Sequence, residues 1–153
     1  MHVDPSSLAV PAPTTTTESE PYWQACRDGR FVLQRCDDCG AWVFYPRVLC
    51  PSCWSMALTW RPASGTGAIR SFSTVHKPGH PGWIPAVPYT VAVITLTEGP
   101  TMLTTLIGIA PEDVRVGLPV EVAFTTVGEF TLPFFRPREA SGPEKSGPET
   151  GVS

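Results

Sequence analysis

Short apolar runs rich in β-branched and aromatic residues recur along this chain, a pattern typical of β-strands. The runs occupy residues 31–34, 42–45, 58–60, 68–76, 89–97, 101–107, 120–127 and 130–135. Turn residues separate the later runs at Glu98-Gly99-Pro100 and Gly128-Glu129. The pattern predicts a mostly β protein with little helix.

Five of these runs fall within about seventy residues after Gly65. So many short strands in so short a segment fit a small closed barrel, and the OB-fold is the five-stranded candidate. An SH3-like barrel is the alternative. We therefore predict an OB-fold over residues 63–138, preceded by a separate unit over residues 30–62.

One short helix is predicted over residues 19–29. Ser19 can cap it, Pro21 suits its first turn and Gly29 lies near its end. A helix this short is marginal in isolation, and its aromatic residues need a surface on which to be buried. We expect the helix to dock on the rest of this protein or on a partner.

Both ends of the chain have compositions that do not favour a packed core. Residues 1–18 are low in charge and rich in Pro and Thr, which predicts a flexible arm, either disordered or dependent on a partner for its order. Residues 139–153 repeat a Ser-Gly-Pro-Glu-like unit, which predicts a disordered tail.

Composition and charge exclude several classes of protein. The 153 residues, 42% of them hydrophobic, suit one domain or two very small ones that share a core. No apolar stretch is long enough to span a membrane and residues 1–20 lack a secretory signal, so we expect a cytoplasmic protein. Residues 30–138 carry nine Arg or Lys against seven Asp or Glu, without the marked basic excess of a nucleic-acid binder.

The most informative chemical signal is a pair of Cys-x-x-Cys motifs, Cys36/Cys39 and Cys50/Cys53, separated by ten residues. Two tight turns can bring four sulfurs to one tetrahedral ion, with bonds of roughly 2.3 Å. Reduced, metal-binding cysteines also agree with a cytoplasmic location. The spacing therefore predicts a zinc ribbon with these four cysteines as metal ligands and zinc as the cofactor.

Neighbouring residues support the two turns. Gly40 follows the first motif, where a turn would need a positive φ, and Pro51 stiffens the second. Iron can bind the same ligand set, and two disulfides would be the alternative in a secreted chain. Cys26 is left over, and we interpret it as a small residue on the helix rather than a reactive thiol.

The order of these landmarks resembles a known family. The landmarks are a short Trp-containing helix, Phe31-Val-Leu-Gln-Arg-Cys36-Asp-Asp-Cys39-Gly, Tyr45-Pro-Arg47, Cys50-Pro-Ser-Cys53, Leu58-Thr-Trp60, Ser64-Gly-Thr-Gly67, Phe72-Ser, Pro88-Tyr89 and Phe134-Phe-Arg136-Pro137. Across roughly residues 19–138 they resemble the family called domain of unknown function 35, in which a rubredoxin-like zinc ribbon precedes an OB-fold. One departure is Tyr45-Pro46, where the family usually has two prolines.

The resemblance implies a role beside thiolase-like enzymes that act on acyl-CoA. Members of the family are accessory subunits of steroid side-chain aldolases with a lipid-transfer-protein-like thiolase fold, or of acyltransferases that make acylated phenols. Others bridge thiolase and hydroxymethylglutaryl-CoA synthase in archaea. We therefore expect a non-catalytic subunit of a hetero-oligomer with a thiolase-like partner, helping to hold acyl-CoA.

The residues themselves show no evident constellation of nucleophile, base and oxyanion site, so no catalytic residue is predicted. One alternative function is a single-stranded nucleic-acid binder, because zinc ribbons and OB-folds both recur in that class. Another is an electron-transfer protein that holds iron at the four cysteines.

A long loop between the first two barrel strands is the predicted ligand site, because long loops in small barrels are often functional. The candidate ligand-binding residues are Phe72, His76, Lys77, Trp83 and Tyr89. The aromatic side chains would pack the pantetheine or acyl portion of an acyl-CoA, and the lysine would face its phosphates. An ordinary surface loop is the alternative.

Overall fold

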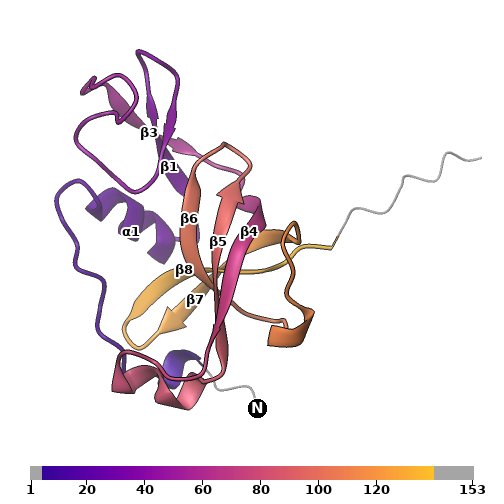
Figure 1. Cartoon of the computed structure of the whole chain (residues 1–153). Coiled ribbons are helices and arrows are strands. Elements are labelled where there is room, and N and C mark those ends of the chain that lie inside the picture. The colour runs from indigo at the N-terminus through magenta and orange to yellow at the C-terminus, as the bar shows by residue number, and fades with distance from the viewer. Residues whose placement is uncertain (1–4, 140–153) are drawn as a thin grey trace, which may run out of the picture.

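Strands dominate the computed structural model of the chain, which describes residues 5–139 (Figure 1). The elements in chain order are η1 (Pro5–Ser7), α1 (Glu20–Arg27), β1 (Val32–Cys36), β2 (Trp42–Val43), β3 (Leu58–Pro62), β4 (Thr66–Val75), η2 (Pro81–Ala86), β5 (Tyr89–Leu96), β6 (Thr101–Leu106), η3 (Pro111–Asp113), β7 (Pro119–Val127) and β8 (Phe130–Pro137). Every strand predicted from the sequence is present, within a few residues of its expected bounds. The mostly β fold class is confirmed.

The first three strands form a small sheet in the order β2-β1-β3. Both neighbours of β1 run antiparallel to it, with Arg35 opposite Trp42 in β2 and opposite Thr59 in β3. The two cysteine motifs lie in the turns at one end of this sheet, since β1 ends at Cys36 and the second motif precedes β3. The sheet therefore fixes where the four thiols sit.

The remaining five strands close into a barrel in the order β4-β5-β6-β8-β7, with β4 pairing β7. Inward and outward residues alternate along β5, where Ala92 and Ile94 are almost fully buried. This alternation is what a strand with one face in the barrel interior requires. The closed five-stranded barrel confirms the predicted OB-fold architecture.

One hydrophobic core joins the helix, the ribbon and the barrel. Tyr22 of α1, with Phe31 and Leu33 near the start of the ribbon, packs in the same cluster as Ile69 and Phe135 of the barrel. Burying one large apolar side chain contributes about 1.5–3 kcal/mol, so this shared cluster holds the two β units together. The helix docks on its own chain, one of the two alternatives expected from its aromatic residues.

The start of α1 differs from the sequence prediction. Ser19 makes no side-chain cap, because its backbone is already helical and its Oγ instead accepts a hydrogen bond of 2.9 Å from the backbone N–H of Thr16. Pro21 does lie in the first turn, and Gly29 takes a φ of +71° just past the end. The proline and glycine predictions are thus confirmed, and the Ser19 cap is wrong.

The segment before the helix contacts the barrel at Leu8. Leu8 is only 4% exposed and packs in a cluster with Val127 and Phe134 at the barrel end far from the ribbon. The arm over residues 1–18 was expected to be disordered or dependent on a partner for its order; its Leu8 packs on the barrel of the same chain, and the flexibility of the arm stays a prediction. Residues 1–4 and 140–153 lie outside the described part of the chain. No helix within residues 5–139 is long and apolar enough to cross a membrane.

Candidate metal centre and ligand loop

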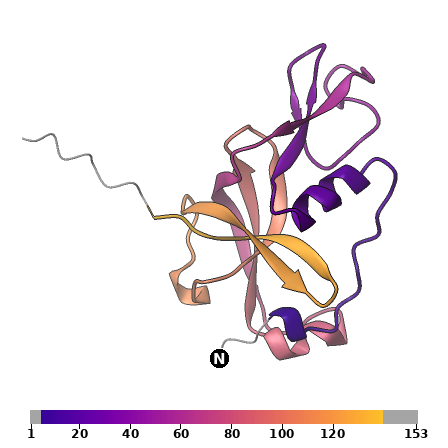
Figure 2. The same cartoon turned by 180° about the vertical axis from the view of Figure 1, so that it is seen from behind.

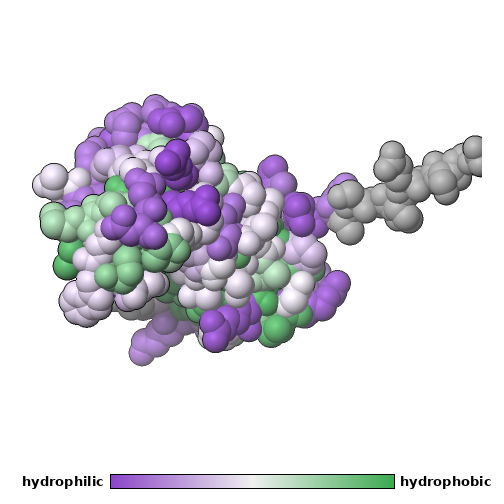
Figure 3. All heavy atoms as spheres, turned by 90° about the horizontal axis from the view of Figure 1, so that it is seen from above, coloured by the Kyte–Doolittle hydropathy of each residue, from purple (hydrophilic) through white to green (hydrophobic). Residues whose placement is uncertain are grey.

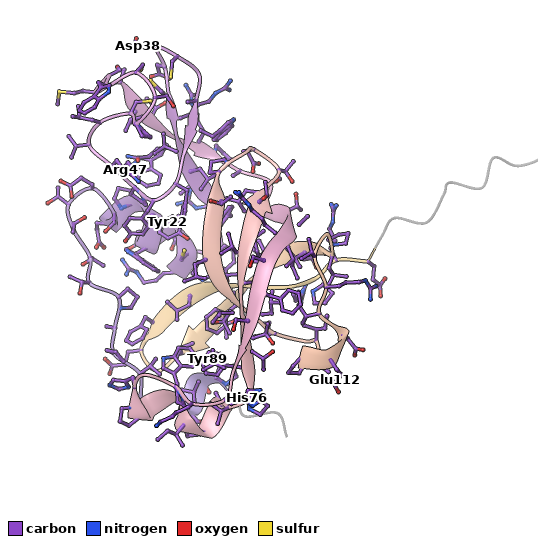
Figure 4. The ribbon with its side chains drawn as sticks, viewed as in Figure 1. Tyr22, Asp38, Arg47, His76, Tyr89 and Glu112 are labelled. Atoms are coloured by element: carbon purple, nitrogen blue, oxygen red, sulfur yellow. The ribbon has the colours of Figure 1, made fainter. Side chains whose placement is uncertain are left out.

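The four cysteines of the two motifs meet at the tip of the ribbon, near Asp38 in Figure 4. Their Sγ atoms all lie within 4.8 Å of one another. The Sγ atoms of Cys36 and Cys53 are 3.6 Å apart, as are those of Cys39 and Cys50. In a tetrahedron with Zn–S bonds of about 2.3 Å, the sulfurs stand about 3.8 Å apart. The sulfur positions therefore fit a tetrahedral zinc ion.

The two motifs have the same backbone conformation. The N–H of Gly40 donates to the carbonyl of Cys36 over 2.8 Å, and the N–H of Trp54 donates to the carbonyl of Cys50 over 2.9 Å. The donor residues are both left-handed, with φ of +75° at Gly40 and +64° at Trp54. We call these turns the first knuckle (residues 36–41) and the second knuckle (residues 50–55).

Backbone amides in the second knuckle favour a thiolate. The pKa of the Cys50 thiol is lowered from 9.0 to about 7, first by a hydrogen bond from the backbone of Cys53 and also by one from Ser52. At Cys53 a backbone hydrogen bond from Ser55 also favours the thiolate, but burial and the three neighbouring thiols outweigh it and raise the pKa to about 12. Four thiolates at this spacing repel one another unless a cation neutralises them. The donor set therefore fits a divalent metal ion electrostatically as well as geometrically.

A site of four thiolates is closed, because all positions of a tetrahedral ion are taken by protein. Such a site can stabilise a fold, but it leaves no position for water or substrate.

Hydrogen bonds also connect the two knuckles and β3. The Ser55 hydroxyl donates to a carboxylate oxygen of Asp38, and the Thr59 hydroxyl donates to Asp37 over 3.0 Å.

The candidate ligand loop lies at the other end of the molecule, where His76 and Tyr89 are labelled in Figure 4. Trp83 in η2 stacks at a tilt on Tyr89 with ring centroids 5.2 Å apart, and it also contacts Phe134 at 6.4 Å. His76 and Lys77 are exposed where the loop leaves β4. The structure thus brings Trp83 and Tyr89 together, with the two basic candidates nearby in sequence and open to solvent.

Phe72 does not join this group. It pairs with Ala92 across the β4–β5 ladder, whereas Tyr89 pairs with Val75. Directly opposed residues share a face of the sheet and positions three apart lie on opposite faces. Phe72 and Tyr89 therefore point to opposite sides of the ladder.

Cys26 is buried at 1% exposure beside Tyr22. Burial raises the pKa of its thiol from 9.0 to about 12, against smaller opposing contributions from Tyr22 and Arg27. A thiol is a nucleophile only as thiolate, so Cys26 is unreactive at neutral pH. This agrees with its interpretation as a small residue on the helix.

A hollow of about 510 Å³ on the ribbon sheet was not anticipated from the sequence. Arg35 and Arg61 both line it, but each guanidinium is already engaged. Arg35 lies 5.2 Å from the ring centroid of Trp42 and donates to the carbonyl of Gly40, while Arg61 lies 3.6 Å from Asp37. The hollow is an open surface whose two guanidinium groups already have partners within the chain, and we assign no ligand to it.

The exposed apolar side chains of the second knuckle were also missed. Trp54 is 77% exposed and Met56 is 73% exposed. A sequence signal for them did exist. Aligning the two motifs with an offset of fourteen residues puts Trp54 at the position of Gly40, which predicts the left-handed backbone that the structure has.

A four-cysteine ribbon whose first strand shares a core with a closed five-stranded barrel defines the class of protein, a rubredoxin-like zinc ribbon followed by an OB-fold. The family models agree: "ChsH2, rubredoxin-like zinc ribbon domain" matches residues 23–59, and "ChsH2, C-terminal OB-fold domain" matches residues 60–125. The chain is 31% identical over 110 residues to a DUF35 domain-containing scaffold protein of Pyrococcus furiosus, covering 71% of this chain and 79% of that protein. The chain belongs to the DUF35 family, as its landmarks predicted.

Two further relatives are informative. The chain is 37% identical over 128 residues to a probable enoyl-CoA hydratase alpha subunit of Thermomonospora curvata, covering 83% of this chain. It spans only 40% of that relative's length. Among solved structures it is similar to a chain of an Ltp2-ChsH2(DUF35) aldolase, with 35% identity and a TM-score of 0.75 over 82% of this chain and 98% of that one.

Proposed function

We propose that this chain is an accessory subunit that binds a thiolase-like enzyme, leaves the chemistry to that enzyme and helps to hold its acyl-CoA substrate. The observation that carries the proposal is the likeness to the chain of the Ltp2-ChsH2(DUF35) aldolase, which this chain covers over 98% of its length. A steroid side-chain aldolase, or a related reaction at a carbon–carbon bond of an acyl-CoA, is the reaction class we favour.

The ribbon's own chemistry supports a subunit without catalysis of its own. We propose that Cys36, Cys39, Cys50 and Cys53 hold one zinc ion, whose contribution is to folding because the site is absent from the unfolded chain. The closed ligand set gives that ion no role in polarising substrate or activating water. The fifth cysteine, Cys26, is buried with a raised pKa and is no nucleophile.

We further propose that the loop from β4 to β5 faces the acyl-CoA. Trp83 and Tyr89 offer a contiguous aromatic surface for the pantetheine or acyl portion, and Lys77 offers a positive charge to the phosphates. His76 stands beside Lys77 at the mouth of the loop. Phe72 was predicted to line the same channel, and it would have to contact ligand from the opposite side of the ladder.

Co-expression tests the proposed function. The full chain is produced with each thiolase-like protein encoded beside its gene, and with the Ltp2 subunit of the related aldolase as a defined probe. We expect one of these proteins to co-purify with the chain and to cleave or condense acyl-CoA, while the isolated chain does neither. Turnover by the isolated chain at the rate of the complex, or no capture of any thiolase-like protein, would refute the proposal.

A further inference from the structure

The two knuckles have the same backbone conformation but carry side chains of different polarity. Arg35 precedes the first knuckle and Gly40 lies in it, whereas the equivalent positions of the second knuckle hold Leu49 and Trp54. The backbone bonds from the donors at the Gly40 and Trp54 positions are the same. Binding a metal therefore does not require apolar side chains at these positions, because the first knuckle forms the same turn with polar and small residues.

Trp54 is the sharpest difference. Its φ of +64° lies in the left-handed region, which glycine adopts freely and which other residues adopt only with strain. Burial of the side chain does not offset this strain, because the side chain is 77% exposed. An indole held in a strained conformation and displayed to solvent points to a function outside the folding of this chain.

Trp54 belongs to a wider apolar surface, which we call the knuckle patch. Its members are Val48, Leu49, Trp54 and Met56, exposed by 50%, 38%, 77% and 73%. The N–H of Cys50 donates to the carbonyl of Ser55 over 2.8 Å, so Leu49 and Met56 are neighbours across the knuckle. Seen from above, the surface is mixed, with small groups of hydrophobic atoms among hydrophilic ones (Figure 3).

The patch has the composition of an interface centre. A large aromatic side chain buries about 150–250 Å², so the indole alone exposes more than about 100 Å². Apolar patches of a few hundred Å² with a polar rim mark protein–protein sites, and tryptophan is enriched among the residues that dominate binding energy. Exposed Arg47 and Asp38 lie in the flanking turns and supply such a rim.

The likeness to a chain of the Ltp2-ChsH2(DUF35) aldolase favours a different protein as the occupant of the patch, because that aldolase pairs its DUF35 chain with an Ltp2 subunit. We therefore take the occupant to be a different protein with an apolar pocket.

We propose that the knuckle patch seats the thiolase-like partner subunit, with the Trp54 indole inserted in an apolar pocket of that partner. This rests on the proposed function for the identity of the partner. The polar first knuckle stays outside the pocket, at its rim.

The variant Trp54→Gly tests the proposal, because glycine suits the backbone and removes only the indole. The dissociation constant of the full chain for the co-purifying thiolase-like subunit is measured by immobilising that subunit. We expect it to rise at least about 30-fold, or about 2 kcal/mol. Met56→Ser should weaken binding less. Val116→Ser, at a site 66% exposed far from the ribbon, is the matched control and should leave the constant unchanged.

Zinc content and melting temperature show whether the variant is folded; we expect the zinc content to equal that of the wild type and the melting temperature to equal or exceed it. Equal partner binding by wild type and Trp54→Gly would overturn the inference while leaving the proposed function standing. Failure of the wild type itself to bind any thiolase-like subunit would overturn both. Dimerisation of the isolated wild type that Trp54→Gly abolishes, measured by sedimentation, would assign the patch to a second copy and overturn the inference too.

Discussion

Leu8 is the most deeply buried side chain between residue 5 and the helix-flanking Ser19, and Leu8→Ala is the change that tests what holds the N-terminal arm. Leu8 is 4% exposed against Val127 and Phe134, which are themselves 0% and 6% exposed. Within residues 5–18 it is the single side chain classed as buried. Val10 of the arm also packs against this cluster, but only partly buried, so removing three carbons from Leu8 removes a large part of the apolar contact that opposes the conformational entropy of the arm.

The expected cost follows from that burial. Burying a leucine contributes about 1.5–3 kcal/mol, and Leu→Ala in a closed core costs about 2–5 kcal/mol. The arm can leave the barrel instead of leaving a cavity, so we expect the lower end, about 2–3 kcal/mol. Each 1.4 kcal/mol is a factor of ten, which makes the open arm roughly 30 to 150 times more populated.

Amide hydrogen exchange followed by mass spectrometry on peptides covering residues 5–18 measures this opening directly. Exchange there should accelerate by that factor in Leu8→Ala, while β5 and β6 keep the wild-type rate. Thr14→Ala, at an exposed position of the same arm, is the control. An arm that exchanges as fast as free peptide in the wild type, or an unchanged rate in Leu8→Ala, would refute the reasoning.

Three further predictions concern the metal, the helix and the loop. Cys39→Ser should give insoluble or metal-free protein, because three thiolates cannot complete the tetrahedron, and elemental analysis that finds full zinc in folded variant would contradict this. Burial raises the pKa of Cys26 to about 12, so the folded thiol keeps its proton while the unfolded one ionises from about pH 9, and stability is lost as pH rises. Urea unfolding between pH 9 and 10 should show wild type losing up to about 1.4 kcal/mol more than Cys26→Ala, and parallel curves would exclude the effect. Trp83→Ala or Tyr89→Ala should raise the Michaelis constant of the partner complex about tenfold with zinc content unchanged. Phe72→Ala should act independently of both, whereas unchanged kinetics in all three would place the acyl-CoA path elsewhere.

Local signals in the sequence were enough to predict the strands and the metal ligands. The eight strands follow from apolar runs and turn residues, and the four cysteines follow from motif spacing, since a metal-binding turn is a local structure. The left-handed φ at Gly40 was predicted for the same reason. These features need only a few neighbouring residues to be determined.

Features set by tertiary contact were not predictable in this way. Leu8 lies in a Pro- and Thr-rich segment without a periodic pattern of apolar residues, so the sequence does not predict that its side chain is buried. The irregular register between Ile69 and Ser71 in β4 decides which way Phe72 faces, and no residue pattern predicts that shift. Ser19 is a residue type that often caps helices, but its hydroxyl oxygen accepts a hydrogen bond from the backbone N–H of Thr16 in the preceding turn instead.

The ribbon and the β4–β5 loop lie at opposite ends of the molecule in both views (Figures 1 and 2), and this arrangement bears on how an accessory subunit can work. Only residues 63–65 separate β3 from β4, and the shared core around Tyr22 and Phe135 leaves little freedom between ribbon and barrel. A partner seated on the ribbon would consequently be held at a fixed distance from the loop. On the proposals above, the zinc site would not need to touch a substrate to influence it, because holding the second knuckle in shape would fix the position of the partner relative to Trp83 and Tyr89.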